Sequence, residues 1–231
     1  MYKMAPLVKE SFYIWYFNGL PMSLYLIIIL ISFISSLSTL LIKNDKLIFR
    51  LFSFFLFITF IIELAAQKMA ENKQSNIFIY NLFTAFEFCF YFFFFHFVLK
   101  EYLKKSKIYY IIILYAALAL INIFLIQGKY NFHTYTYILG CMICIILSIT
   151  YFYFLFKHSK VSNLTKDAAF WISTGLLFYY SCTLPVFGII NFLTNLSVPF
   201  YKGFEFIIEF MNIALYLLFT IGFLCRISTR K

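Results

Sequence analysis

Charged residues are scarce in this 231-residue chain: they make up 12% of the sequence, and nine of them are Asp or Glu. Glycine occurs seven times and proline four times, which excludes collagen-like and low-complexity chains. Apolar residues fill 64% of the positions and aromatic residues 24%, whereas soluble domains are about 45–50% apolar and about 25% charged. A soluble fold of this length could not bury so much apolar surface, so the composition predicts a membrane protein.

Groups that carry catalysis, metal binding or cofactor attachment are also sparse in the apolar runs. Asp45 and Asp167 both lie outside these runs, and the last run, 204–225, has no lysine for a retinal Schiff base. Cys141 and Cys144 are spaced Cys-x-x-Cys, but there is no second pair and no nearby histidine, so we expect them to pack in the core. The sequence therefore predicts neither enzymatic activity nor a cofactor or metal site.

Seven apolar runs are each long enough to cross a bilayer, which takes about 20 helical residues. We place these spans at 22–42, 47–66, 77–98, 108–126, 135–156, 168–190 and 204–225. The connections are short, so neighbouring spans should pack antiparallel. The predicted fold is an all-α membrane protein with seven transmembrane helices over 22–225, an interfacial N-terminal segment at 1–21 and a basic cytoplasmic tail at 226–231.

Lysine and arginine are distributed unequally between the two sides that these spans define. The N-terminus and the loops on its side carry six lysines, whereas the opposite loops and the C-terminal tail carry thirteen Lys and Arg residues. The positive-inside rule then predicts a cytoplasmic C-terminus and an N-terminus outside. Because the basic residues lie in short loops beside the bilayer, the net charge of +10 fits lipid headgroups as partners and not nucleic acid.

Four of the carboxylates lie inside the spans, where an ionised carboxylate costs several kcal/mol unless it is paired or solvated. Helical spacing of three or four residues puts several of them on one face with amide side chains. Five spans place polar groups at similar depth in the outer half of the predicted bundle. The predicted ligand site is an outward-facing acidic cavity formed by Glu63, Gln67, Glu87, Asn122, Tyr180, Glu205, Glu209 and Asn212.

Two interpretations of these carboxyl groups stay open. Because no Lys or Arg lies deep within a span to pair with them, an acidic cavity would favour a cationic ligand, a metal ion or protons. Alternatively, each Glu is protonated and hydrogen-bonded across helices to Tyr, Ser or Asn, which fixes the bundle without binding a ligand.

Two segments, IYNLFTAFEFCFYFFFF at 79–95 and FWISTGLLFYYSCTLPVFG at 170–188, carry a resemblance to a known group of proteins. The chain resembles uncharacterised small seven-helix inner-membrane proteins of the Bacteroidota, in which a Tyr-rich third helix with a Glu and a Phe-Trp-Ile…Gly sixth helix recur. The resemblance implies a seven-helix fold and a multi-pass protein of the cell inner membrane. It assigns no activity to any residue.

We expect the chain to be an integral membrane sensor or regulatory subunit. Ligand contact in the outer cavity would shift helix packing between two states, and a separately encoded cytoplasmic signalling or membrane partner would bind the basic loops. One alternative is a small cation- or proton-coupled transporter, although the inner halves of the spans are mostly Phe, Ile and Leu. Another alternative is a structural subunit of a membrane complex.

Overall fold

A computed structural model describes residues 22–41, 46–100, 102–103, 107–158, 164–189 and 198–228, except for the side chains of 22–23, 158, 189, 198–202, 204–205 and 227–228. These ranges consist of helices joined by short turns and connections, and they contain no strand. Their helices are α2 (Met22–Leu41), α3 (Leu47–Glu71), α4 (Ile77–Leu99), α5 (Ile108–Ile121), the π-helical turn η1 (Asn122–Ile126), α6 (Thr134–His158), the 3-10 turn η2 (Leu164–Lys166), α7 (Ala168–Ile189) and α8 (Val198–Ser228). The predicted interfacial segment at 1–21 lies outside the described residues.

Within the described residues, seven helical stretches are long and apolar enough to cross a membrane, so the prediction of an all-α, multi-pass membrane protein is confirmed. Two helices extend beyond the predicted spans by more than two residues. α3 continues to Glu71, where the Gln67 amide donates a hydrogen bond of 3.0 Å to the Glu71 carboxyl one turn later. α8 begins at Val198 with a proline in its first turn, where no backbone N–H is required.

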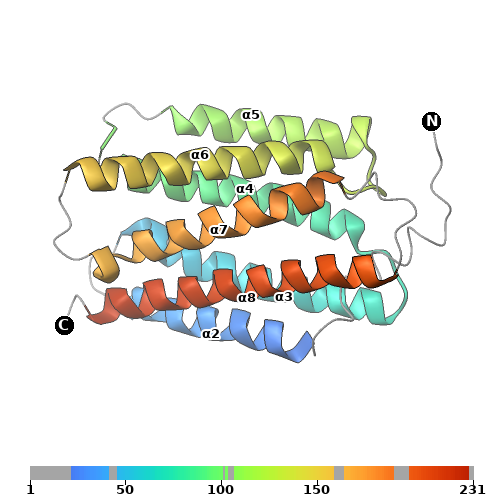
Figure 1. The fold of residues 1–231 in the computed structure, drawn as a ribbon, viewed down its shortest axis with the longest axis horizontal. Helices are drawn as coiled ribbons and strands as arrows, with labels where there is room; N and C mark the ends of the chain where they lie inside the picture. The colour runs from blue at the N-terminus through green and yellow to red at the C-terminus, as the bar shows by residue number, and fades with distance from the viewer. Residues whose placement is uncertain are drawn as a thin grey trace.

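Six of the described helices form a closed ring. Each contacts the next in the order α2, α3, α4, α6, α7, α8, and α8 contacts α2 again. α5 lies outside this ring against α4 and α6 (Figure 1). Side chains that point to the centre of the ring therefore come from six helices, whereas those of α5 pack against its rim or face the lipid.

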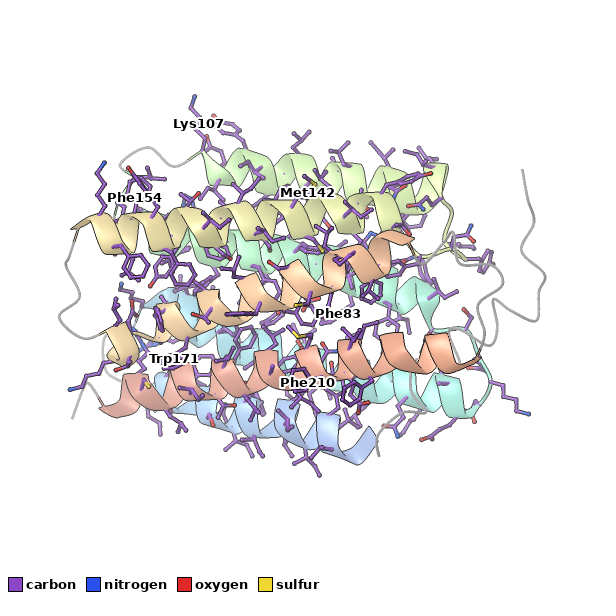
Figure 2. All side chains as sticks on the ribbon, viewed as in Figure 1. Phe83, Lys107, Met142, Phe154, Trp171 and Phe210 are labelled. Atoms are coloured by element: carbon purple, nitrogen blue, oxygen red, sulfur yellow. The ribbon has the colours of Figure 1, made fainter. Side chains whose placement is uncertain are left out.

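The bundle has two chemically different ends. At the Lys129 end, α2, α4, α6 and α8 begin, and Lys68, Lys73 and Lys129 are the basic side chains described there. At the Arg226 end the described basic side chains are Lys46, Arg50, Lys100, Lys107, Lys157, Lys166 and Arg226. Figure 2 shows Lys107, Phe154 and Trp171 toward this same end. The charge asymmetry expected from the sequence is therefore an asymmetry between the two ends of the fold.

Small residues let the helices approach closely, as is usual in membrane bundles. On α6, a Cβ added at Gly140 would lie 2.7 Å from the ring of Phe88 on α4, so glycine is required at this crossing. Between α2 and α3, the Ser53 hydroxyl donates a hydrogen bond of 2.8 Å to the Ser36 carbonyl, and the Thr39 hydroxyl donates one of 3.2 Å to the Phe49 carbonyl. These contacts fix neighbouring helices where no hydrophobic effect drives them together.

An aromatic cluster fills the ring at mid-length. Phe52 on α3 is fully buried, and its ring meets five others edge-on, with centroid distances of 5.1 to 5.9 Å. We call these six residues the Phe52 cluster: Phe52, Phe55, Phe90, Phe94, Phe219 and Phe223. Edge-to-face pairs add about 0.5–1.5 kcal/mol each beyond the area they bury. The cluster joins α3, α4 and α8 into one packed unit.

Replacing Phe52 by alanine should strongly destabilise the bundle, because the cavity left behind is surrounded by rings that cannot collapse into it. We expect Phe52→Ala to cost about 3–5 kcal/mol of unfolding free energy, measured by denaturant titration in detergent micelles. Phe54→Ala is the matched control, since Phe54 lies on the same helix with 60% of its side chain exposed. Equal losses in the two variants would contradict the assigned core.

Candidate functional site

A cavity lies inside the ring toward the Lys129 end. Its volume is about 70 Å³, which is enough for several waters. All six ring helices contribute side chains to its wall, as does Phe132 in the connection before α6. α5 contributes none.

The wall combines aromatic rings with a few polar groups. Its apolar residues are Ile77, Phe83, Phe132 and Phe187, and its polar residues other than tyrosine are Glu63, Asn76, Thr84, Glu87 and Asn212. Five tyrosines complete it: Tyr25, Tyr80, Tyr137, Tyr179 and Tyr216. Among the described lining residues none is basic, so two carboxyl groups face the cavity without a cation from the wall.

Glu63 accepts more hydrogen bonds than Glu87, the other carboxyl group of the wall. Its side chain is 6% exposed, and each of its oxygens accepts a hydrogen bond from a tyrosine. The Tyr25 hydroxyl donates to one oxygen over 3.1 Å, and the Tyr80 hydroxyl donates to the other over 2.9 Å. Because these tyrosines come from α2 and α4, the Glu63 carboxyl ties three helices together.

Glu87 is held from one side. It is half-buried, and the Tyr91 hydroxyl, one turn later on α4, donates to one carboxyl oxygen over 2.9 Å. Within the described part of the chain its other oxygen has no hydrogen-bond partner. Glu87 therefore presents an accepting oxygen that a ligand or water can use.

One stripe of α4 supplies much of the polar wall. Tyr80, Thr84, Glu87 and Tyr91 are spaced by four, three and four residues and so lie along one face of the helix. The Thr84 hydroxyl donates to the Tyr80 carbonyl over 2.7 Å and also contacts the ring of His133.

His133 anchors the connection between α5 and α6 to α4. Its side chain is fully buried, its backbone N–H donates to the Asn81 side chain over 3.2 Å, and its ring contacts the hydroxyls of Thr84 and Thr136. Burial lowers the pKa of His133 from 6.5 to about 3, so the ring is neutral at physiological pH. The Asn81 amide in turn donates to the Asn131 carbonyl over 2.7 Å.

The structure brings three of the eight predicted site residues to this cavity: Glu63, Glu87 and Asn212. Four others lie elsewhere. Gln67 bonds to Glu71, and Asn122 lies in η1 and donates to Gln127 and Thr136. Tyr180 is buried beside Phe88, and Glu209 is half-buried but is not part of the wall. The side chain of Glu205 lies outside the described residues.

The difference between the predicted site and the observed cavity wall has a geometric cause. The sequence gives the depth of a residue in the membrane, but not which helices close the ring. Asn122 lies in η1, which continues α5 outside the ring, and its side-chain amide donates to Gln127 and Thr136 there. Gln67 lies one turn beyond Glu63, where its amide bonds to the exposed Glu71 and not to the cavity wall.

The five lining tyrosines were missed by the sequence prediction. Two of them follow from helical spacing: Tyr80 lies on the stripe of Thr84 and Glu87, and Tyr216 follows Asn212 by four residues. Tyr25, Tyr137 and Tyr179 have no other polar residue of the wall three or four positions away in sequence. Their place in the wall depends on the tertiary contacts of α2, α6 and α7.

The donor set of the cavity does not suit a metal ion. Within the described residues no three His, Cys, Asp or Glu side chains are close enough to bind one metal. Both Glu63 oxygens already accept tyrosine hydroxyls, whereas Ca²⁺ takes six to eight oxygen ligands.

Comparisons with protein-family models, with curated proteins and with solved structures find no match to this chain. Its function must therefore be inferred from the geometry and chemistry of the site itself.

The buried neutral His133 predicts a pH-dependent stability. Its pKa is lower in the folded chain than in the unfolded chain. The contribution of the neutral ring to the free energy of unfolding is therefore fully present above pH 6.5 and is lost as the pH falls toward 3. We expect the thermal midpoint of the detergent-solubilised protein to fall between pH 7 and pH 4.5, and to fall less in His133→Asn, which cannot be protonated. The same pH slope in both proteins would contradict this role.

Proposed function

We propose that this chain is an integral membrane sensor or regulatory subunit that takes its ligand from outside into the cavity. The unequal charge of the two ends supports this orientation, because the basic end is favoured on the cytoplasmic side. The resemblance noted above supports the cell inner membrane as its location. A membrane-impermeant maleimide that labelled Lys157→Cys but not Lys129→Cys in intact cells would contradict the orientation.

A continuous series of aromatic contacts connects the cavity to the opposite end and is the observation that carries the proposal. Tyr216 in the cavity wall contacts Phe219 over 5.8 Å, and Phe219 contacts Phe52 over 5.2 Å. Phe94 then bridges Phe52 to Phe49, at 5.9 and 6.4 Å. A change in helix position at the cavity would therefore displace the packed rings in turn. Closely packed side chains are not compressed; they shift from one packing arrangement to another.

The series ends at a second, smaller cavity of about 40 Å³ at the Arg226 end. There the Arg226 guanidinium lies 3.8 Å from the centre of the Phe49 ring. Across this cavity the Tyr151 hydroxyl donates to the Asp167 carboxyl over 3.0 Å, and Asp167 caps α7 through the Ala169 N–H. These contacts join α3, α6, α7 and α8, so a separately encoded partner bound to this basic end would detect their relative positions.

A cation- or proton-coupled transporter is the second candidate, and the Phe52 cluster argues against it. Phe52, Phe55, Phe94 and Phe219 are at most 1% exposed and lie between the two cavities. A transported cation would need these rings to separate. The third possibility, a structural subunit, is consistent with the tyrosine bonds of Glu63 but gives no role to the free oxygen of Glu87.

Coupling between the two ends is measurable without knowing the ligand. In nanodiscs, Glu87→Gln should change hydrogen exchange at η2 and at the C-terminal turn of α8, because the altered cavity shifts the packing of the ring. Glu71→Gln, an exposed carboxyl on α3, should leave both segments unchanged. An exchange difference confined to the Lys129 end, or a proton flux into proteoliposomes that depends on Glu87, would contradict the sensor proposal; the flux would favour the transporter.

A further inference from the structure

We propose that the ligand of the cavity is a small organic ammonium ion that carries alkyl groups on its nitrogen. This inference rests on the proposed function for its biological meaning, but the binding itself can be tested separately.

The charge of the cavity selects a cation. Glu63 and Glu87 both face it, and the described wall has no Lys, Arg or His. Carboxyl groups in a membrane interior are paired, bonded or solvated. A bound cation would supply the missing positive charge and would contact the oxygen of Glu87 that the described protein leaves unbonded.

The aromatic walls select an organic cation. On one side, the rings of Tyr25 and Tyr216 lie 5.9 Å apart. On another, Phe132, Tyr137 and Phe187 pack together with centroid distances of 4.6 to 5.3 Å. Ring faces attract alkylated ammonium groups, which is how aromatic cages recognise quaternary nitrogen. An inorganic divalent cation is usually held by several carboxylate ligands, and the described residues bring no three Asp, Glu, His or Cys side chains together.

The size of the cavity limits the ligand. A cavity of about 70 Å³ requires a compact ligand, and tetramethylammonium, with five non-hydrogen atoms, is the smallest quaternary ammonium ion. We therefore use tetramethylammonium as the probe, and tert-butanol as an uncharged molecule of the same shape and size.

The experiment is equilibrium dialysis of radiolabelled tetramethylammonium against the full chain in nanodiscs at constant ionic strength. We expect saturable binding at one site per chain that excess unlabelled probe removes and that tert-butanol and magnesium chloride do not. Glu63→Gln and Glu87→Gln should each weaken binding about tenfold, the factor for about 1.4 kcal/mol. Glu71→Gln should bind as the unaltered protein does.

Ring substitutions separate a cation–aromatic contact from general polarity. Tyr216→Phe keeps the ring and should bind within about threefold of the unaltered protein, whereas Tyr216→Leu should weaken binding about tenfold. Thermal midpoints of the variants identify any that fail to fold. If Glu87→Gln does not fold, Glu87→Asp, which keeps the charge, should retain measurable binding.

Several results would overturn the inference: no saturable binding, equal displacement by tert-butanol, displacement by magnesium, or equal affinity in Glu63→Gln and Glu71→Gln. These outcomes are distinct from a failure of the proposed function. Binding together with Glu87-dependent uptake of the probe into proteoliposomes would keep the ligand class and exclude the sensor. Absent binding, with exchange at the Arg226 end still responding to Glu87→Gln, would keep the sensor and exclude this ligand class.

Discussion

The bond between a buried carboxyl group and two tyrosine hydroxyls is the interaction on which the rest of the structure depends. Glu63 lies in an apolar layer where an unsatisfied polar group costs several kcal/mol, and Tyr25 and Tyr80 satisfy one oxygen each. Because the three residues come from α2, α3 and α4, this requirement sets how these helices meet. The cavity lies where these helices meet, between the fully bonded carboxyl group of Glu63 and the partly bonded carboxyl group of Glu87.

The same bundle is polar toward one end and aromatic at its middle, and the two properties serve different purposes. Polar groups at the Lys129 end give the cavity its chemistry. The rings of the Phe52 cluster close its floor and connect α3, α4 and α8 through ring contacts toward Phe49 and Arg226. Under the proposed function, these ring contacts would report what occupies the cavity, while the buried cluster would keep the bundle closed between its two ends.

Hydropathy and length predicted the seven helices within a few residues, because each span must satisfy its own backbone in the lipid. The same count predicted that Glu63, Glu87 and Asn212 lie at similar depth, and the structure brings all three to one cavity. What could not be predicted was the order of helices around the ring. The exclusion of α5 removed Asn122 from the cavity, and the packing of α6 and α7 added Tyr137 and Tyr179. The buried His133 was also unexpected, since its position in a connection predicts exposure.

The most direct test places the ligand among the tyrosines. Nuclear Overhauser transfer can be measured from the methyl protons of tetramethylammonium to the chain, which is deuterated except for its tyrosine rings and held in deuterated detergent. The account predicts transfer to tyrosine ring protons that disappears when both Glu63 and Glu87 are replaced by Gln. Transfer that is absent, or that persists unchanged in the double variant, would contradict a cation site inside the ring.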